Sequence, residues 1–127
     1  KWFWEQTRDI SRSVEENRER QSESVMEKAK KYIRENFQKE LTLDEVSKIV
    51  DISPYYFSKL FKQETGENFI EYLTKIRMKN AEMLLRDSHY SIKEVCIMSG
   101  YGDPNYFSRI FKKYEGVTPS EYRERLG

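Results

Sequence analysis

The 127-residue chain is poor in the residues on which several protein classes depend. Its single cysteine, Cys96, excludes an internal disulfide and a thiolate metal cluster, and this usage fits a reducing, cytoplasmic compartment. No apolar run approaches the roughly 18 residues that span a bilayer, and no signal peptide is visible. Only three prolines and five glycines are present, which favours long helices over many tight turns.

An excess of charge of one sign is lacking as well. Lys plus Arg number 23 and Asp plus Glu number 22, so any role of charge must be local. One histidine, one cysteine and no glycine-rich phosphate loop leave almost nothing for nucleophilic or metal chemistry. We therefore expect no enzyme, no catalytic residues, no metal and no cofactor. The chain begins at Lys1 rather than Met, which favours a fragment of a longer protein.

Helix start signals are what the chain has in abundance. In five stretches a Ser, Thr or Asn precedes a Glu by three residues, so that each side chain can satisfy a free backbone amide of the other residue. Two further starts place a capping residue before a proline, Ser53-Pro54 and Asp103-Pro104. The five capping stretches begin at Ser24, Thr42, Asn68, Ser91 and Thr118. Seven short helices, without the alternation typical of strands, predict an all-α fold.

One of these helices occurs twice. The stretch PYYFSKLFKQETG, residues 54–66, returns as PNYFSRIFKKYEG, residues 104–116. The offset is 50 in this stretch and 49 upstream of it, so the second copy carries one extra residue in its turn. Two copies are too few for a solenoid. They predict a duplicated module, here called the first unit (about 41–66) and the second unit (about 91–116), joined by a helix over about 69–86.

Each unit reads as two short helices separated by a tight turn. A small residue, Ser47 or Cys96, stands where the two helices must cross closely. The turn holds Asp51 or Gly100, residue types that tolerate a positive φ. This is the spacing of a helix-turn-helix, whose second helix lies in the major groove of DNA. A single such pattern is weak, but two in tandem with glycines at matching positions downstream are a strong indication.

The polar faces of the two repeated helices predict a DNA interface. Their phenylalanines form an inward stripe at helical spacing, which turns the polar residues outward. Arg can pair with guanine, Asn with adenine, and a Tyr ring can contact a thymine methyl group, whereas Lys suits phosphates. The free amides at a helix start add a phosphate site. The base-facing candidates are Tyr55, Ser58, Lys59, Asn105, Ser108 and Arg109, and the phosphate candidates are Ser53, Lys62, Lys112 and Lys113.

The second unit also carries a family resemblance. The stretch GYGDPNYFSRIFKK, residues 100–113, resembles the signature of the AraC/XylS family of transcriptional regulators. The closing TPSEYR, residues 118–123, is similar to the start of that family's C-terminal helix. Together with the repeat, the resemblance covers about residues 24–127. It implies a DNA-binding domain of seven helices, with two helix-turn-helix units joined by a rigid helix.

The resemblance implies partners too. Both recognition helices would enter successive major grooves of one double-stranded DNA, about 34 Å apart. The base-facing residues differ between the units, so the target would be asymmetric. Activation of transcription is the commoner outcome in the family, which implies RNA polymerase as a partner. An upstream sensor or receiver domain, and a homodimer of the full-length protein, are further implied.

At several positions a purely structural role competes with a functional one. The phenylalanines of the repeat could stack on bases, but their spacing favours a core. Cys96 could be a redox switch, but a small buried side chain is favoured. His89 could touch a phosphate, although an exposed loop histidine is the simpler reading. The four phenylalanines are Phe57, Phe61, Phe107 and Phe111.

Two alternatives concern whole segments. Residues 1–23, KWFWEQTRDISRSVEENRERQSE, are compatible with a helix that either transmits a signal or is the remnant of a linker. The residues favour neither reading. The near-neutral total also leaves open a helical protein-interaction module that never touches DNA. The placement of charge separates the two, because acidic residues are few in the repeated helices and lie at their far ends.

Overall fold

The computed structural model describes residues 24–126 of the chain. Within these residues there are seven helical segments and no strand, which confirms the all-α prediction. The first helix covers residues 24–36, followed by α2 (Leu43–Ile49), α3 (Pro54–Thr65), α4 (Phe69–Leu85), α5 (Ile92–Met98), α6 (Pro104–Glu115) and α7 (Pro119–Leu126). The expected helix over residues 1–23 lies outside the described part of the chain.

Side-chain caps set most of the helix starts as expected. Asn68 and Ser91 form reciprocal capping boxes with Glu71 and Glu94, and the same exchange of hydrogen bonds joins Thr118 and Glu121. The backbone N–H of Ser91 lowers the pKa of the Glu94 carboxyl, and that of Thr118 does the same for Glu121. The prediction for Ser24 is wrong, because Ser24 is already helical and so does not cap this helix.

The expected capping box at the start of α2 forms only in part. The Thr42 hydroxyl accepts the Glu45 N–H at 3.1 Å. The Glu45 carboxylate instead accepts a 2.6 Å hydrogen bond from the hydroxyl of Tyr32, on the first helix, and pairs with Lys39 at 3.4 Å. The Tyr32 hydroxyl is the main cause of the lowered pKa of Glu45. A tertiary contact has replaced the local one, and it ties α2 to the first helix.

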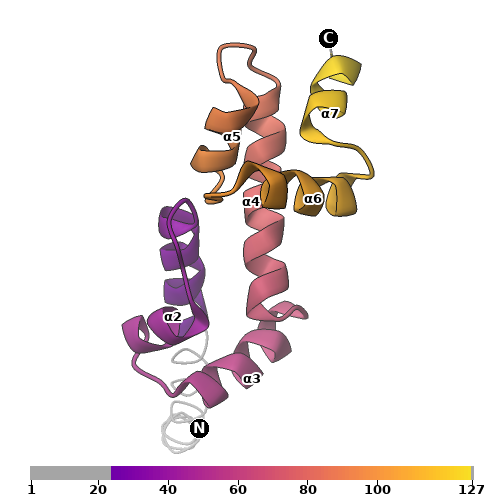
Figure 1. Cartoon of the computed structure of the whole chain (residues 1–127). Helices are drawn as coiled ribbons and strands as arrows, with labels where there is room; N and C mark the ends of the chain where they lie inside the picture. Colours follow the sequence, from indigo (N-terminus) through magenta and orange to yellow (C-terminus); the bar gives the residue numbers. More distant parts are fainter. Residues whose placement is uncertain (1–23, 127) are drawn as a thin grey trace, which may run out of the picture.

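The helices enclose two separate hydrophobic cores. The first includes Phe57, Phe61 and residues of the helix over 24–36, and the second includes Phe107 and Phe111. Helix α4 is the long rod of Figure 1, with α2 and α3 around one end and α5, α6 and α7 around the other. It supplies Phe69 and Leu73 to the first core, and Met78, Ala81 and Leu85 to the second. The expected connecting helix thus contributes side chains to the cores of both units.

The two turns follow the sequence prediction. Four residues separate α2 from α3, and five separate α5 from α6, so the second turn does contain the extra residue. Asp51 has a φ of 59° and Gly100 a φ of 96°. The two repeated helices, α3 and α6, each end at a glycine in the left-handed conformation, Gly66 and Gly116 respectively.

The duplication extends past the repeated helix. Tyr72 of α4 meets the ring of Phe61 edge-on at 5.1 Å, and Tyr122 of α7 meets the ring of Phe111 edge-on at 5.4 Å. Helix α7 therefore closes the second unit as the start of α4 closes the first. Of the two neighbouring rings on α6, Phe107 enters the core while Tyr106 remains exposed.

Gly100 provides a test of the second turn. A Cβ at Gly100 would overlap the carbonyl oxygen of Phe37 and come within 2.7 Å of Arg77 Nε, whereas a Cβ at Gly116 would meet nothing within 4 Å. Both residues have a positive φ, a strain of about 1–2 kcal/mol for alanine. We expect Gly100→Ala to lower the free energy of unfolding by about 3 kcal/mol or more, and Gly116→Ala by only the strain. Denaturant unfolding measures both, and equal losses would contradict the close approach.

Candidate nucleic-acid interface

Buried aromatic rings orient the two recognition helices, α3 and α6. Phe57 and Phe61 of α3, and Phe107 and Phe111 of α6, are fully buried. This confirms the core reading and leaves no base-stacking platform of phenylalanines. Since an α-helix turns by about 100° per residue, the opposite face of each helix must meet solvent.

The predicted base-facing residues occupy those solvent faces. Five of the six are exposed, and Ser108 is half-buried. Tyr55 is the most exposed of the large hydrophobic side chains between residues 24 and 126, at 72%. The structure gathers Tyr55, Ser58 and Lys59 on α3, and the other three on α6, at two levels along α4 (Figure 1). The six therefore form two separate patches, one on each unit.

One pairing on this surface was missed in the sequence. The ammonium group of Lys59 lies 4.9 Å from the centre of the Tyr55 ring. Such a cation–π contact holds a long side chain in a narrower range of positions. The spacing of four residues on one helix was the available signal. Tyr55 thus supports Lys59 as well as presenting its own ring.

The predicted phosphate-facing residues are also exposed, and they reveal a difference between the units. The Ser53 hydroxyl oxygen caps α3 by accepting the Tyr56 N–H at 3.2 Å, which leaves its hydrogen free to donate. At the matching position of α6, the Asp103 carboxylate accepts the Asn105 N–H at 2.9 Å. The start of α3 is therefore neutral, whereas the start of α6 carries a negative charge.

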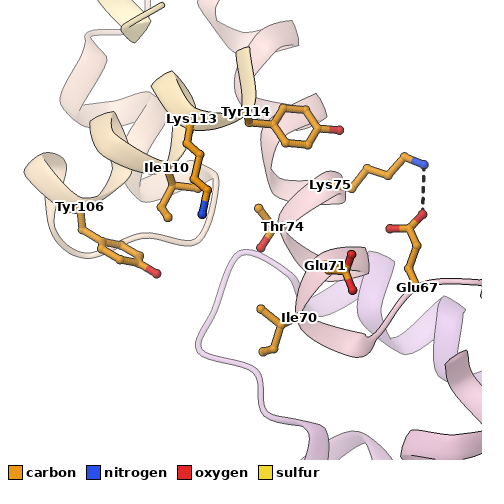
Figure 2. A pocket seen from close by; sticks show the side chains of 9 residues that line it. All are labelled: Glu67, Ile70, Glu71, Thr74, Lys75, Tyr106, Ile110, Lys113 and Tyr114. Carbon is orange, nitrogen blue, oxygen red and sulfur yellow. Dashed lines mark hydrogen bonds and ion pairs between the residues drawn. The ribbon is translucent and has the colours of Figure 1, made fainter. Parts of the chain in front are cut away.

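Lys113 lies on a different flank of α6 from Lys112. Figure 2 shows Lys113 and Ile110 facing Ile70 and Thr74 across a groove between α6 and the first half of α4. The groove has a volume of about 570 Å³. An ion pair of 3.3 Å between Lys75 and Glu67 lies beside it. Lys113 therefore borders the groove between α6 and α4, which Lys112 does not line.

The remaining candidates have plain structural roles. Cys96 is fully buried, and its Sγ–H donates to the Tyr101 carbonyl at 3.3 Å. Its complete burial confirms the reading as a small core residue, and the same burial raises the pKa of this thiol. His89 is an exposed loop residue, and its Nδ1 lies 2.7 Å from Asp87 Oδ1.

Residues 24–126 lack two further kinds of feature. They contain no group of three or more His, Cys, Asp or Glu side chains that could hold a metal ion. None of the helices described is both long and apolar enough to cross a membrane.

Comparison with known proteins decides the family. The helix-turn-helix domain family matches residues 46–125. The solved C-terminal domain of AraT, a response regulator from Geobacillus stearothermophilus, is 41% identical with a TM-score of 0.77, and the match covers 80% of this chain and 84% of that one. The chain belongs to the AraC/XylS family. It carries the family's tandem helix-turn-helix domain.

Curated AraC/XylS relatives place the domain within longer proteins. The transcriptional regulatory protein YesN of Bacillus subtilis is 48% identical over 79 residues, which are 60% of this chain and 21% of that protein. The lactose operon transcription activator of Staphylococcus xylosus is 39% identical over 95 residues, 75% of this chain and 34% of that protein. The chain thus spans a fifth to a third of these relatives. They are regulators, which confirms that this AraC/XylS domain is not an enzyme.

The charge at the start of α6 yields a prediction for this AraC/XylS domain. Asp103→Ser should keep a capping oxygen, as at Ser53, while removing a negative charge from the start of α6. One such charge contributes about 1 kcal/mol at 4 Å in water, so we expect about fivefold tighter binding to all duplexes. A mobility-shift titration on specific and random duplexes measures the change. Weaker binding, or a gain confined to one sequence, would show that Asp103 contacts a base.

Proposed function

We propose that the domain reads one asymmetric stretch of double-stranded DNA, with α3 and α6 in successive major grooves, and thereby regulates transcription. One observation carries the proposal. Helices α3 and α6 share hydrophobic cores with the same continuous helix, α4, and each exposes a polar face to solvent. Helix α4 has 17 residues and thus a length of about 26 Å. This length is of the same order as the roughly 34 Å of one turn of DNA, which supports two recognition helices in neighbouring major grooves.

The side chains on the two faces suit different bases. Arg109 offers two donors to guanine, and Asn105 offers the donor and acceptor that adenine requires. Tyr55 and Lys59 hold the matching positions of α3 and present different chemistry. The two half-sites should therefore differ, which gives the target a direction along the duplex.

The distribution of charge favours DNA over a protein partner. From residue 41 to the end of the chain there are 13 basic and 13 acidic residues, so the sum is uninformative. Within the recognition helices the acidic residues are Glu64 and Glu115, both near the C-terminal ends. The N-terminal parts of these helices, which enter the groove first, carry Lys59 and Arg109 without an acidic neighbour on the same helix turn.

The role in the whole protein is part of the same proposal. The relative from Staphylococcus xylosus is named as an activator, which supports activation and contact with RNA polymerase. AraT is described as a response regulator, which supports a receiver or other sensor domain upstream of this one. We further propose that the full-length protein acts in the cytoplasm, that it forms a homodimer binding two such sites, and that residues 1–23 connect the domains.

Arg109→Ala tests the base assignment. Duplexes selected from a random pool first supply the target sequence. The substitution should cost about 1–3 kcal/mol on that target and relax the preference at one base pair, because the bidentate contact is lost. Competition binding against single-base variants measures both effects. Arg34→Ala, which removes an exposed arginine from the first helix, is the matched control and should change neither.

Lys62→Ala tests the phosphate assignment. We expect weaker binding to every duplex alike, and a salt dependence whose logarithmic slope is smaller by about one, because one phosphate contact is lost. Titrations at several salt concentrations measure the slope. If neither Lys62→Ala nor Arg109→Ala altered affinity for the selected duplex, the reading faces would be assigned to the wrong side of the domain.

A further inference from the structure

The relative placement of the two units depends on few contacts. Their hydrophobic cores share no residue, and each core has its own section of α4. A helix of this length can bend, so α4 alone does not hold one unit at a fixed angle to the other. A contact between the units beside α4 is needed for that purpose.

Arg77, near the middle of α4, makes such a contact. Its Nε donates to the Phe37 carbonyl and its Nη2 to the Lys39 carbonyl, both at 2.9 Å. Phe37 and Lys39 follow the first helix and belong to the first unit's side of the molecule. The same guanidinium lies 5.2 Å from the centre of the Tyr101 ring, in the turn of the second unit. One side chain thus touches both units.

The surroundings of Arg77 make this contact specific. Gly100 approaches so closely that an added Cβ would overlap the Phe37 carbonyl oxygen. Next to this approach lies a cleft of about 490 Å³, lined by Leu41 from one side and by Ile97 and Tyr101 from the other. The units therefore meet at a small polar junction beside open space.

We propose that Arg77 is a positioning residue that fixes the angle and distance between α3 and α6, and thereby sets the half-site spacing that the domain accepts. The inference rests on the proposed function for its meaning at DNA. A planar guanidinium held by two carbonyls and an aromatic ring resists rotation. Loss of it lets the second unit pivot on α4, so the domain binds its target less well and tolerates other spacings better.

The chain offers a matched control in Arg123 of α7. Its Nε donates to the Leu85 carbonyl at 3.0 Å and its Nη2 to the Asp87 carbonyl at 3.2 Å. This is the same fork onto two carbonyls past a helix end, and both arginines are half-buried. All partners of Arg123, however, lie at the end of α4 and on the side of the second unit. Arg123→Met removes the same kind of bonds without touching the junction.

The first experiment measures the junction without DNA. Spin labels at Gln63→Cys on α3 and Ser120→Cys on α7, both exposed positions, report the distance between the units in the 127-residue chain. Cys96 is fully buried, which protects it from labelling. We expect a clearly broader distance distribution in Arg77→Met and an unchanged one in Arg123→Met. Equal widths in folded Arg77→Met and the parent chain would overturn the proposal.

The second experiment measures spacing at DNA. One base pair is inserted or removed between the half-sites of the selected duplex, which rotates one half-site by about a tenth of a helical turn. We expect a penalty of about tenfold or more for the parent chain and for Arg123→Met, and of about threefold for Arg77→Met. A uniform loss across all spacings in Arg77→Met would indicate a merely structural role and overturn the proposal.

The two failures are distinguishable. If the parent chain binds no selected duplex, the proposed function fails, while the label distances still decide whether Arg77 fixes the units. If the parent chain binds with steep spacing dependence and Arg77→Met does the same, only the role of Arg77 fails. Arg77→Lys keeps the charge and one donor group, so it should fall between parent and Arg77→Met. If Arg77→Met does not fold, Arg77→Lys replaces it in both experiments.

Discussion

The arrangement of this domain depends on a single helix that belongs to two cores at once. Helix α4 supplies Phe69 and Leu73 to the first core, and Met78, Ala81 and Leu85 to the second. Neither core is therefore complete without α4. Small units bury too little apolar surface to be stable alone. Because both draw on α4, disruption of α4 exposes two cores together. The same helix carries both recognition helices, which links the stability of the fold to the geometry of the DNA interface.

Aromatic packing converts that scaffold into two outward faces. Within each unit the rings of the recognition helix are in contact, 5.5 Å apart for Phe57 and Phe61 and 5.9 Å apart for Phe107 and Phe111. A tyrosine of the following helix meets the second ring edge-on in both units. Such pairs contribute about 0.5–1.5 kcal/mol beyond the area they bury. The rings thus define how each recognition helix is rotated, and this rotation decides which side chains remain available for a ligand.

Local signals predicted most of the fold and which faces of α3 and α6 are exposed to solvent. Capping residues and prolines marked the starts of α2 to α7, and the period of the phenylalanines separated inside from outside on α3 and α6. Two of the failures share one cause, which is contact between residues far apart in the chain. Glu45 left its capping box for Tyr32, 13 residues away. Arg77 and Arg123 bind carbonyls 36 to 40 residues away, for which no spacing rule exists.

The total charge is nearly neutral, but some acidic side chains and some basic side chains have different roles in the domain. Several acidic side chains act within the fold: Glu71, Glu94 and Glu121 close capping boxes, and their pairing with helix N-termini stabilises the fold. Lys62 and Arg109, by contrast, form no ion pair with any residue between 24 and 126. A count of charges weighs both kinds equally. A phosphate backbone laid along the recognition helices would instead meet Lys62 and Arg109, which form no ion pair within the described residues, so a neutral domain can present a locally positive surface.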